Sequence, residues 1–409
     1  MEFREYQKEI ISVGCDILRD NHFLYLAMEV RTGKTLTSLG IAESMGFRKV
    51  LFLTKKKAMR SVLNDSELLK HSYVLEVINY ESLHKALKLK WDLIICDEAH
   101  TMGAFPKPSK RAIAVKELIT STESYVILLS GTPTPESYSQ MYHQVYGIKT
   151  NPFNAFKNFY SFAKTYIKID QKRINGFYIN DYTNGSQDII RAMEKYTINY
   201  TQKEAGFKVE INEHILRCDM KPSTYKLIDR LKRDLVINGN DEVILADTAV
   251  KLMTKIHQMF SGTIKFESGN SMVLDNSKAI FIKDKFEGKK MGIFYKFTEE
   301  LKALESVFED DICTDLETFE NTDKHIALQI VSGREGISLK QADVLVYYNI
   351  DFSATSYWQS RDRMTTKDRQ HNNVYWIFSN GGIEDDIYKA VNNKKNYTLN
   401  HFKKKFVER

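Results

Sequence analysis

The sequence predicts an α/β fold in which two doubly wound parallel sheets flank a small helical and aromatic accessory segment. Short apolar runs alternate with stretches of helical periodicity, and this alternation occurs twice along the 409 residues. Between the two alternating regions, aromatic residues instead recur at helical spacing. We therefore expect a first lobe over residues 1–149, an accessory segment over 150–210 and a second lobe over 211–409.

Composition and charge are those of an ordinary globular chain. Apolar residues make up 43% and charged residues 27%, and no apolar run approaches the roughly 20 residues of a membrane span. The N-terminus lacks the basic and apolar regions of a secretory signal, so we expect a cytoplasmic protein with no membrane partner. Four cysteines far apart favour reduced thiols over zinc or disulfides, and the net charge of +6 permits a polyanionic partner.

The first lobe opens with an amphipathic helix, expected over residues 3–19 because its apolar residues follow one helix face. Short apolar runs predict its strands, and the amphipathic stretches between them predict its helices. In chain order we expect strand 23–28, helix 36–45, strand 49–54, helix 55–70, strand 73–79, helix 81–89, strand 92–96, helix 111–120 and strand 125–129. Elements at this spacing form a parallel sheet that binds ligands at the carboxyl ends of its strands.

A candidate phosphate-binding loop follows the first of these strands. It contains Arg31, Thr32, Gly33, Lys34 and Thr35. Gly33 allows close approach of the backbone to an oxyanion, and the following helix N-terminus presents N–H groups. Lys34 supplies a positive charge, and the Thr35 hydroxyl is suited to a magnesium ion. The full pattern GxxxxGK[ST] has a first glycine where this chain has Met28, so the loop alone is a weak signal.

An acidic pair, Asp97 and Glu98, supports the same chemistry. It begins the run Asp-Glu-Ala-His at 97–100, directly after the apolar strand 92–96. Carboxylates at the end of a buried strand are costly unless a ligand compensates them. Asp97 is suited to hold magnesium through water, and Glu98 to orient and deprotonate the attacking water. Together, the loop and the acidic pair predict nucleotide hydrolysis.

A third loop at the same edge, Ser-Gly-Thr-Pro at 130–133, ends the strand expected beside the acidic one. We expect it to link the nucleotide state to another surface. The accessory segment is marked by an aromatic helix face, for which core packing is favoured over stacking on nucleic-acid bases. This face consists of Phe153, Phe156, Phe159, Tyr160, Phe162, Ala163, Tyr166 and Ile167. Asn-Gly pairs at 175–176 and 184–185 predict hairpin-like turns.

The second lobe repeats the alternation without a phosphate loop of its own, which suggests that it completes a site formed with the first lobe. We expect strand 214–218, helices 222–235 and 243–260, strands 290–295, 325–331, 344–349 and 374–378, and a terminal helix from about residue 383.

Two arginines stand out in the second lobe, Arg361 and Arg363. Alternate positions do not share one helix face, so at most one of them points at a given anion. An arginine delivered to a γ-phosphate stabilises the charge of the transition state. The alternative is a surface ion pair with Asp362 or Asp368.

With these residues identified, the sequence resembles a superfamily 2 helicase or translocase, most closely the Swi/Snf-like branch in its compact phage or bacterial form. The resemblance covers nearly the whole chain. In order, the family motifs correspond to residues 4–7 (glutamine motif), 33–35 (I), 51–54 (Ia), 79–81 (a nucleic-acid contact), 97–100 (II), 130–133 (III), 292–295 (IV), 332–339 (V) and 359–363 (VI). Abundant Lys, Asn, Ile and Tyr beside 6 prolines fit an AT-rich phage genome, and hence a host cytoplasm.

The resemblance implies two RecA-like lobes that sandwich ATP and Mg²⁺, with nucleic acid crossing both lobes on the opposite face. It places Arg4 and Gln7 at the adenine and Gly336 among the nucleotide contacts. Relatives carry a second motif VI arginine where this chain has Thr366, so Arg363 is the first choice for the catalytic arginine, with Arg361 or Arg369 as substitutes.

The function expected from these observations is an ATP-dependent DNA helicase or translocase. It would move on or remodel duplex, forked or single-stranded DNA in replication or recombination, with other proteins of those processes as partners. Two alternatives stay open: an RNA helicase, and a nucleic-acid-binding ATPase that acts as a switch or loader without processive motion. A non-hydrolysing scaffold is disfavoured by Lys34, Asp97 and Glu98.

Overall fold

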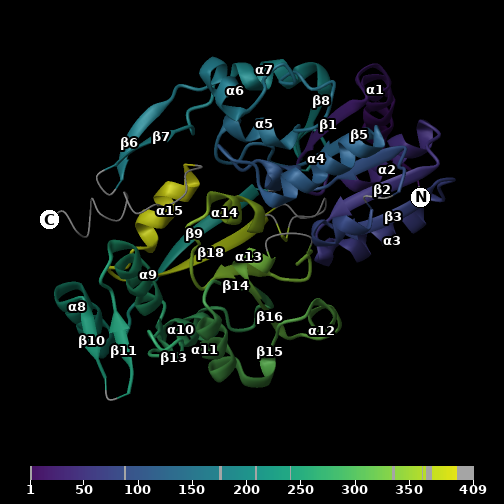
Figure 1. The fold of residues 1–409 in the computed structure, drawn as a ribbon. Helices are drawn as coiled ribbons and strands as arrows, with labels where there is room; N and C mark the ends of the chain where they lie inside the picture. Colours follow the sequence, from purple (N-terminus) through teal and green to yellow (C-terminus); the bar gives the residue numbers. More distant parts are fainter. Residues whose placement is uncertain are drawn as a thin grey trace. The chain divides into compact units, whose positions relative to one another are not determined.

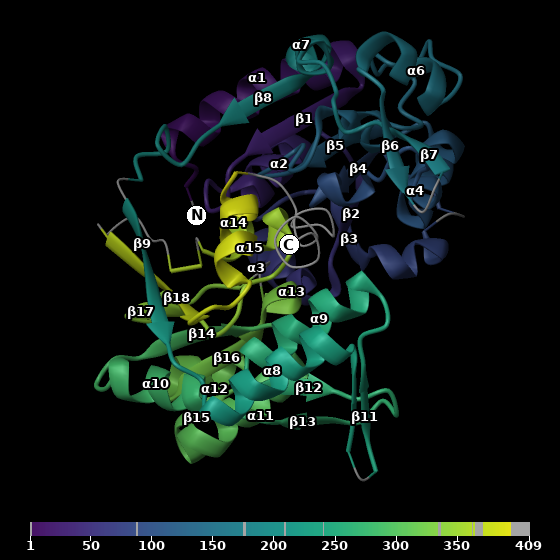
Figure 2. The same cartoon turned by 90° about the vertical axis from the view of Figure 1, so that its left-hand side faces the viewer.

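Two units divide the chain, Met1–Phe207 and Lys208–Arg409, and each is built on a parallel sheet of six strands (Figures 1 and 2). The computed structural model describes residues 2–86, 89–174, 177–207, 210–239, 241–333, 337–361, 363–364 and 371–393. Helices cover both sheets, so the predicted class of two RecA-like, doubly wound lobes is confirmed. Among the described helices, none has the length and apolar character needed to cross a membrane.

The sheet of the first lobe has the strand order β3-β2-β4-β5-β1-β8, with every pair parallel. Its strands are β1 (Phe23–Met28), β2 (Lys49–Thr54), β3 (Val74–Asn79), β4 (Leu93–Cys96), β5 (Tyr125–Leu129) and β8 (Thr197–Tyr200). Because all strands run the same way, their carboxyl ends lie on one side of the sheet. The predicted phosphate loop, the acidic pair and the third loop all follow strands on this side.

Helices of the first lobe largely follow the predicted spans. They are α1 (Glu5–Asn21), α2 (Lys34–Ser44), α3 (Met59–Leu69), α4 (Lys110–Thr122), α5 (Met141–Gln144), α6 (Phe159–Tyr166) and α7 (Asp188–Met193). One prediction is wrong in type: the span 81–89 was expected to be an α-helix, but the structure has a 3-10 helix, η2 (Tyr80–Lys85). The side chain of Asn79 accepts from the Ser82 N–H, a local cap that stabilises this tight turn.

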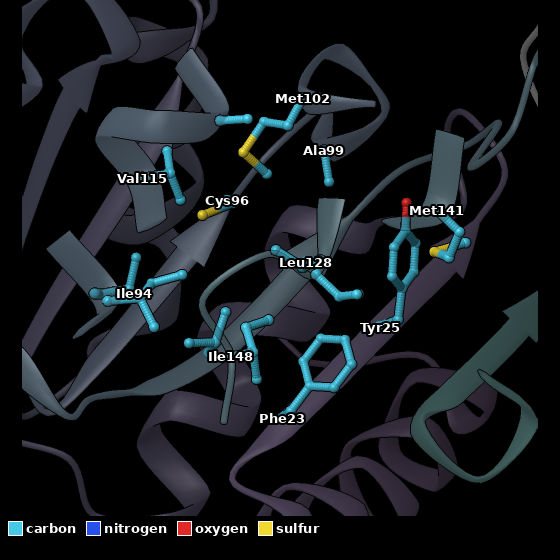
Figure 3. Close-up of a cluster of buried hydrophobic side chains, with 14 of the residues drawn as sticks. Phe23, Tyr25, Ile94, Cys96, Ala99, Met102, Val115, Leu128, Met141 and Ile148 are labelled. Atoms are coloured by element: carbon cyan, nitrogen blue, oxygen red, sulfur yellow. The ribbon is translucent and has the colours of Figure 1, made fainter. Parts of the chain in front are cut away.

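Successive residues of β1 pack on opposite faces of the first sheet, and all six are buried. Phe23 and Tyr25 belong to one apolar cluster with Ile94 and Leu128, shown in Figure 3. Leu24 and its even-numbered neighbours belong to a second cluster beneath α1 and α2. Burial on both faces explains why the parallel strands appear in the sequence as continuous apolar runs.

Most of the segment expected to be accessory, residues 150–210, belongs to the unit Met1–Phe207. Strand β8, which the sequence analysis did not predict, pairs in parallel with β1 and forms the edge of the sheet. Core packing of the aromatic face is confirmed, because Phe153, Phe159 and Phe162 are buried in the same cluster as Phe23. Strands β6 (Asp170–Ile174) and β7 (Phe177–Asp181) form an antiparallel hairpin beside this core, and the turn expected at 175–176 lies outside the described residues.

The second lobe has the strand order β15-β16-β14-β17-β18-β9, again with every pair parallel. These strands are β15 (Ile312–Cys313), β16 (His325–Gln329), β14 (Met291–Tyr295), β17 (Val344–Tyr347), β18 (His371–Ser379) and β9 (Glu210–Cys218). Helices are α8 (Pro222–Asp234), α9 (Ala249–Phe260), α10 (Ser277–Lys285), α11 (Thr298–Phe308), α12 (Leu316–Asn321), α13 (Ile330–Gly333), α14 (Ala354–Ser360) and α15 (Glu384–Asn392).

The helix predicted over 243–260 is wrong in its first third. Val243–Leu245 forms strand β11, paired antiparallel with β10 (Val236–Asn238), and α9 begins only at Ala249. The side chain of Thr248 accepts from the Lys251 N–H and caps α9. A second small antiparallel pair, β12 (Thr263–Lys265) with β13 (Ser271–Val273), follows α9.

Candidate active site

The predicted phosphate loop occupies the turn between β1 and α2. Gly33 has a φ of 83° and Arg31 a φ of 64°, both in the left-handed region. These two turns bring the chain directly into α2, which begins at Lys34. The first N–H groups of a helix have no acceptor within it and carry the positive end of its dipole, so this terminus suits an anion.

Gln7 lies directly beside this loop. It is 2% exposed, its Oε1 accepts the Arg4 N–H at 3.0 Å, and a Cβ at Gly33 would meet its Nε2. The left-handed φ of Gly33 favours glycine at this position on conformational grounds. Arg4 donates to the Tyr6 hydroxyl at 3.1 Å, and that hydroxyl donates to the Thr32 carbonyl oxygen at 2.9 Å, so residues 4–7 contact the predicted phosphate loop.

Asp97 stands at the end of β4, where its Oδ2 accepts the Thr54 hydroxyl at 2.9 Å. Its enclosure by protein atoms, followed by the neighbouring Glu98 carboxylate, raises the pKa of Asp97 to about 6. The positive charge of Lys34 and the hydrogen bond from Thr54 act in the opposite direction. The loop lysine therefore lies close enough to act on Asp97, whose pKa nevertheless stays above its ordinary value.

Glu98 adopts a left-handed backbone conformation with a φ of 51°, which is uncommon for a residue with a side chain. Its Oε2 lies 3.3 Å from Nδ1 of the buried His100, and the same Nδ1 lies 3.0 Å from Oγ of Ser130. Strand β4 is the neighbour of β5, as expected. The acidic pair and the third loop are thus in contact through His100.

Magnesium and ATP fit this arrangement. Mg²⁺ prefers oxygen ligands and is usually held by one or two carboxylates together with water and phosphate oxygens. Asp97 offers such a carboxylate with a raised pKa, and Thr35 offers a hydroxyl in the first turn of α2. Among the described residues, no group of three or more His, Cys, Asp or Glu could hold a metal by itself. An ion at this site would therefore depend on phosphate and water oxygens for the rest of its shell.

Arg361 is engaged within the second lobe. Its Nη1 lies 2.7 Å from Oε1 of Glu213, and its guanidinium lies 3.9 Å from the ring centroid of Trp358. Glu213 also accepts from Tyr357, Trp376 and Tyr388; we call these residues, with Arg361, the Glu213 cluster. The sequence alternative of an ion pair with Asp362 or Asp368 involves residues outside the described ones, and the described partner on β9 was not predicted.

Arg363 is 7% exposed and lies against the loop that precedes β17. Its backbone carbonyl accepts the Leu339 N–H at 2.8 Å, and its Nη1 lies 3.4 Å from the carbonyl oxygen of Ile337. The predicted motifs V and VI are therefore in contact. Gly336 and Arg369 lie outside the described residues.

Several supporting residues were not predicted as site residues. Thr54 donates to Asp97, and the Tyr80 hydroxyl donates to the Asp97 carbonyl oxygen while the Arg111 guanidinium lies 4.5 Å from the Tyr80 ring centroid. The sequence offered a partial signal, because Thr54 ends one predicted strand and Tyr80 follows another at the side of the sheet where the acidic pair lies. That both of them contact Asp97, one at its carboxylate and one at its backbone carbonyl, could not be deduced from spacing alone.

The fold and its loops define the class of this protein: an ATPase of superfamily 2, Swi/Snf-like branch, with two RecA-like lobes. A family model described as "SNF2-related domain" matches residues 41–274, more than half of the 409 residues. The chain belongs to this family. The matched span begins after the phosphate loop and ends before motif IV.

Individual relatives are distant. The CHD3-type chromatin-remodeling factor CHR7 of Arabidopsis thaliana is 20% identical over 371 residues, which is 80% of this chain and 29% of that protein. The chain thus spans less than a third of that relative. Two structures of the Sulfolobus solfataricus SWI2/SNF2 ATPase core, one in complex with dsDNA and one of the domain alone, each give a TM-score of 0.43. Both matches cover 96% of this chain. The match to the DNA complex covers 91% of that chain at 15% identity, and the match to the domain alone covers 89% of that chain at 16% identity.

Proposed function

We propose that this protein is an ATP-dependent DNA translocase that couples hydrolysis to movement on, or remodelling of, DNA. The observation that carries the proposal is the convergence of three loops at one edge of the first sheet. There, the charge of Lys34 acts on the Asp97 carboxylate, and His100 joins the acidic pair to the third loop. This is the arrangement expected for nucleotide hydrolysis with a sensor for the hydrolytic state.

We assign a role in this proposal to each predicted first-lobe residue. Thr32, Gly33 and Lys34 bind phosphate through backbone N–H groups and the ammonium charge. Thr35 and Asp97 would hold magnesium, which supplies charge neutralisation of the phosphates when it is bound. Glu98 orients and deprotonates the attacking water. At the adenine end, Arg4 and Gln7 contact the base, since Gln7 already lies beside the loop.

Between the two arginines, the structure favours Arg363 for the catalytic role. Arg361 forms an ion pair with Glu213 and stacks on Trp358, contacts that a move to a phosphate would break. Removing the partner of a half-buried ion pair is costly, so Arg361 is better suited to a structural role. Arg363 lies against residues 337–339 of motif V, and we propose that Gly336 in the same motif contributes a nucleotide contact.

DNA is the proposed track. The net charge of +6 is compatible with a polyanionic partner, and the printed name of the Arabidopsis relative is that of a chromatin-remodeling factor. Phosphate contacts through residues 51–54, 79–81 and motifs IV and V would be largely independent of base sequence. We place this activity in replication or recombination, with other proteins of those processes as partners and the cytoplasm as its location.

The experiment that tests this proposal is displacement of a third strand from duplex DNA. A translocase moving along the duplex displaces the third strand in an ATP-dependent manner, and Lys34→Ala abolishes the displacement. The assay is run at fixed low salt, because phosphate contacts make affinity steeply salt-dependent. DNA-stimulated hydrolysis without displacement would instead support the switch or loader, and stimulation by RNA alone would support the RNA helicase.

A further inference from the structure

The phosphate loop lacks the first glycine of its motif. The segment that follows the edge strand β8, remote from the loop in sequence, contacts the loop. We propose that Gln202, just after β8, is a positioning residue that sets the backbone of residues 29–32 for nucleotide binding. This inference rests on the proposed nucleotide site, and it assigns a role to a residue outside the family motifs.

Carbonyl oxygens of the loop have donors. Gln202 Nε2 donates to the Val30 carbonyl oxygen at 2.9 Å, and the Tyr6 hydroxyl donates to the Thr32 carbonyl oxygen at 2.9 Å. The carbonyl oxygen of Glu29 accepts the Thr32 hydroxyl at 2.8 Å. In a trans peptide the C=O and the following N–H point in opposite directions. A donor fixed on the Val30 carbonyl oxygen therefore directs the Arg31 N–H away from Gln202. In the same way, the Tyr6 hydroxyl on the Thr32 carbonyl oxygen directs the Gly33 N–H away from Tyr6.

Glu29, the first residue of the loop, is bound to the same segment in two further ways. Its N–H donates to the Tyr200 carbonyl oxygen at 2.9 Å, which continues the β1–β8 pairing. Its carboxylate Oε2 accepts the backbone N–H of Gln202 at 2.7 Å. Gln202 thus contacts the loop through both its backbone and its side chain, and the charged acceptor makes one of these bonds a strong one.

The loop needs such support because its own backbone is unfavourable. Arg31 has a φ of 64°, a conformation that costs free energy in a residue with a Cβ and persists only when its surroundings enforce it. Met28 stands where the motif has a glycine and is fully buried in β1. Contacts from outside the loop therefore offset the cost of the Arg31 conformation.

The segment that carries Gln202 is itself held in place by hydrogen bonds and ring stacking. Thr201 donates to the Glu204 carboxylate through both its N–H and its hydroxyl, each at 2.7 Å, and the Tyr200 ring stacks on Tyr6 with centroids 4.8 Å apart. Figure 2 shows β8 alongside β1, with α1 beside them. Gln202 therefore contacts the phosphate loop from a turn that these contacts hold in place.

Two variants test the proposal. Gln202→Ala removes the side-chain donor, and Gln202→Glu keeps the size of the side chain but places an oxygen against the Val30 carbonyl. Gln187→Ala is the matched control, because Gln187 is an exposed glutamine of the same lobe. Thermal unfolding confirms that each variant is folded.

The first readout needs no nucleotide. Hydrogen exchange of peptides covering residues 28–35 is measured in the ligand-free full chain, and we expect faster exchange in both Gln202 variants with the rest of the lobe unchanged. The second readout is the Kd for a fluorescent, non-hydrolysable ATP analogue with Mg²⁺. We expect it to rise about tenfold, as the loss of one or two hydrogen bonds predicts, with KM rising similarly and kcat changing less than about twofold.

Wild-type exchange in both variants would overturn the proposal. So would faster exchange with an unchanged Kd, or recovery of wild-type behaviour in Gln202→Glu, which would reduce the residue to filling space. Failure of the nucleotide site itself gives a different pattern: the wild-type chain would not bind the analogue, and Lys34→Ala would change nothing, while the exchange result would still report on the loop.

Discussion

The two lobes share a six-stranded parallel sheet but differ in how they treat carboxylates at the ends of their strands. In the first lobe, enclosure and the Glu98 charge raise the pKa of Asp97 to about 6. In the second lobe, burial alone would raise the pKa of Asp351, but the Lys296 charge, with Nζ 2.7 Å from Oδ1, and hydrogen bonds to the carboxylate outweigh it and lower that pKa.

The protein itself supplies the charge and hydrogen bonds that stabilise the Asp351 carboxylate. The Asp97 carboxylate is left to be stabilised by a bound cation. Two further contacts occur between buried polar groups of the second lobe: Lys278 and Glu384 form an ion pair at 2.9 Å with both side chains 0% exposed, and Asn349 joins His257 to Glu300. In the first lobe, the Lys34 charge and the Thr54 hydrogen bond do not offset the effects of enclosure and of the Glu98 charge on Asp97. The comparison teaches that the site is found by incomplete electrostatic compensation as well as by motif.

The largest effect that sharpens this comparison is expected for Glu98→Gln. Removal of the general base should lower kcat by about 10²–10⁴-fold while the variant still binds ATP, because the amide keeps the shape but cannot accept the proton of the attacking water. Steady-state turnover and nucleotide titration check it. Glu136→Gln, a change at another first-lobe glutamate, serves as the control, and normal turnover in Glu98→Gln would remove the assigned role.

In the second lobe, Lys278→Met should lower the free energy of unfolding. Glu384 would remain as a buried carboxylate without its ion-pair partner, a loss of about 3–5 kcal/mol. Denaturant unfolding followed by tryptophan fluorescence measures it, since Trp376 is buried in this lobe. The exposed Lys285→Met is the matched control on the same helix. Equal stability of the two variants would mean that the ion pair of Lys278 with Glu384 does not stabilise the lobe.

The two arginines should separate by the kind of defect. Arg363→Ala should lower kcat by about 10²-fold or more with little loss of stability, if it supplies transition-state charge. Arg361→Ala should mainly lower the free energy of unfolding, by about 3 kcal/mol, because Glu213 loses its ion-pair partner. Turnover and denaturant unfolding of both variants decide it, and the reverse pattern would exchange their roles.

A smaller effect is expected for Thr54→Val, which removes the hydroxyl that donates to Asp97. One hydrogen bond to a carboxylate should reduce kcat/KM by about tenfold without unfolding the chain. Thr120→Val provides the comparison, because that exposed hydroxyl donates only to carbonyl oxygens of its own helix. Unchanged kcat/KM in Thr54→Val would show that Asp97 is positioned without it.

The smallest effect is a pH dependence in the second lobe. The folded-state pKa of Asp351 lies below its ordinary value of 3.8, so the stability it contributes is full above that value and is lost as pH falls through the folded-state pKa. Asp351→Asn should therefore be less stable than wild type at neutral pH, by about 1.5 kcal/mol, and the difference should shrink below about pH 4. Urea unfolding at several pH values measures it; a constant difference would contradict the ion pair.

Much of the fold could be predicted because parallel strands buried on both faces leave continuous apolar runs, as in residues 23–28 and 125–129. Strand β8 was missed because it is short and half polar, and pairing with β1 stabilises it more than its own composition. The helix predicted over 243–260 failed at its start because Val243–Leu245 has the composition of a strand and finds a partner in β10.

The site was predictable where its chemistry lies in short motifs, as for Lys34 and Asp97. It was not predictable where residues remote in sequence meet. Glu213 lies 148 positions from Arg361, and Gln202 lies 172 positions from Val30. No periodicity or spacing rule connects such pairs, because tertiary packing alone brings them together.

The measurement that tests the central claim most directly is steady-state ATP hydrolysis by the wild-type chain and by Lys34→Ala, each with and without duplex DNA at fixed low salt. Lys164→Ala, an exposed lysine of the same lobe, is the control. The account predicts hydrolysis that duplex DNA stimulates, that Lys34→Ala abolishes and that Lys164→Ala retains. Hydrolysis that survives in Lys34→Ala would contradict the assignment of the phosphate loop and of the acidic pair beside it.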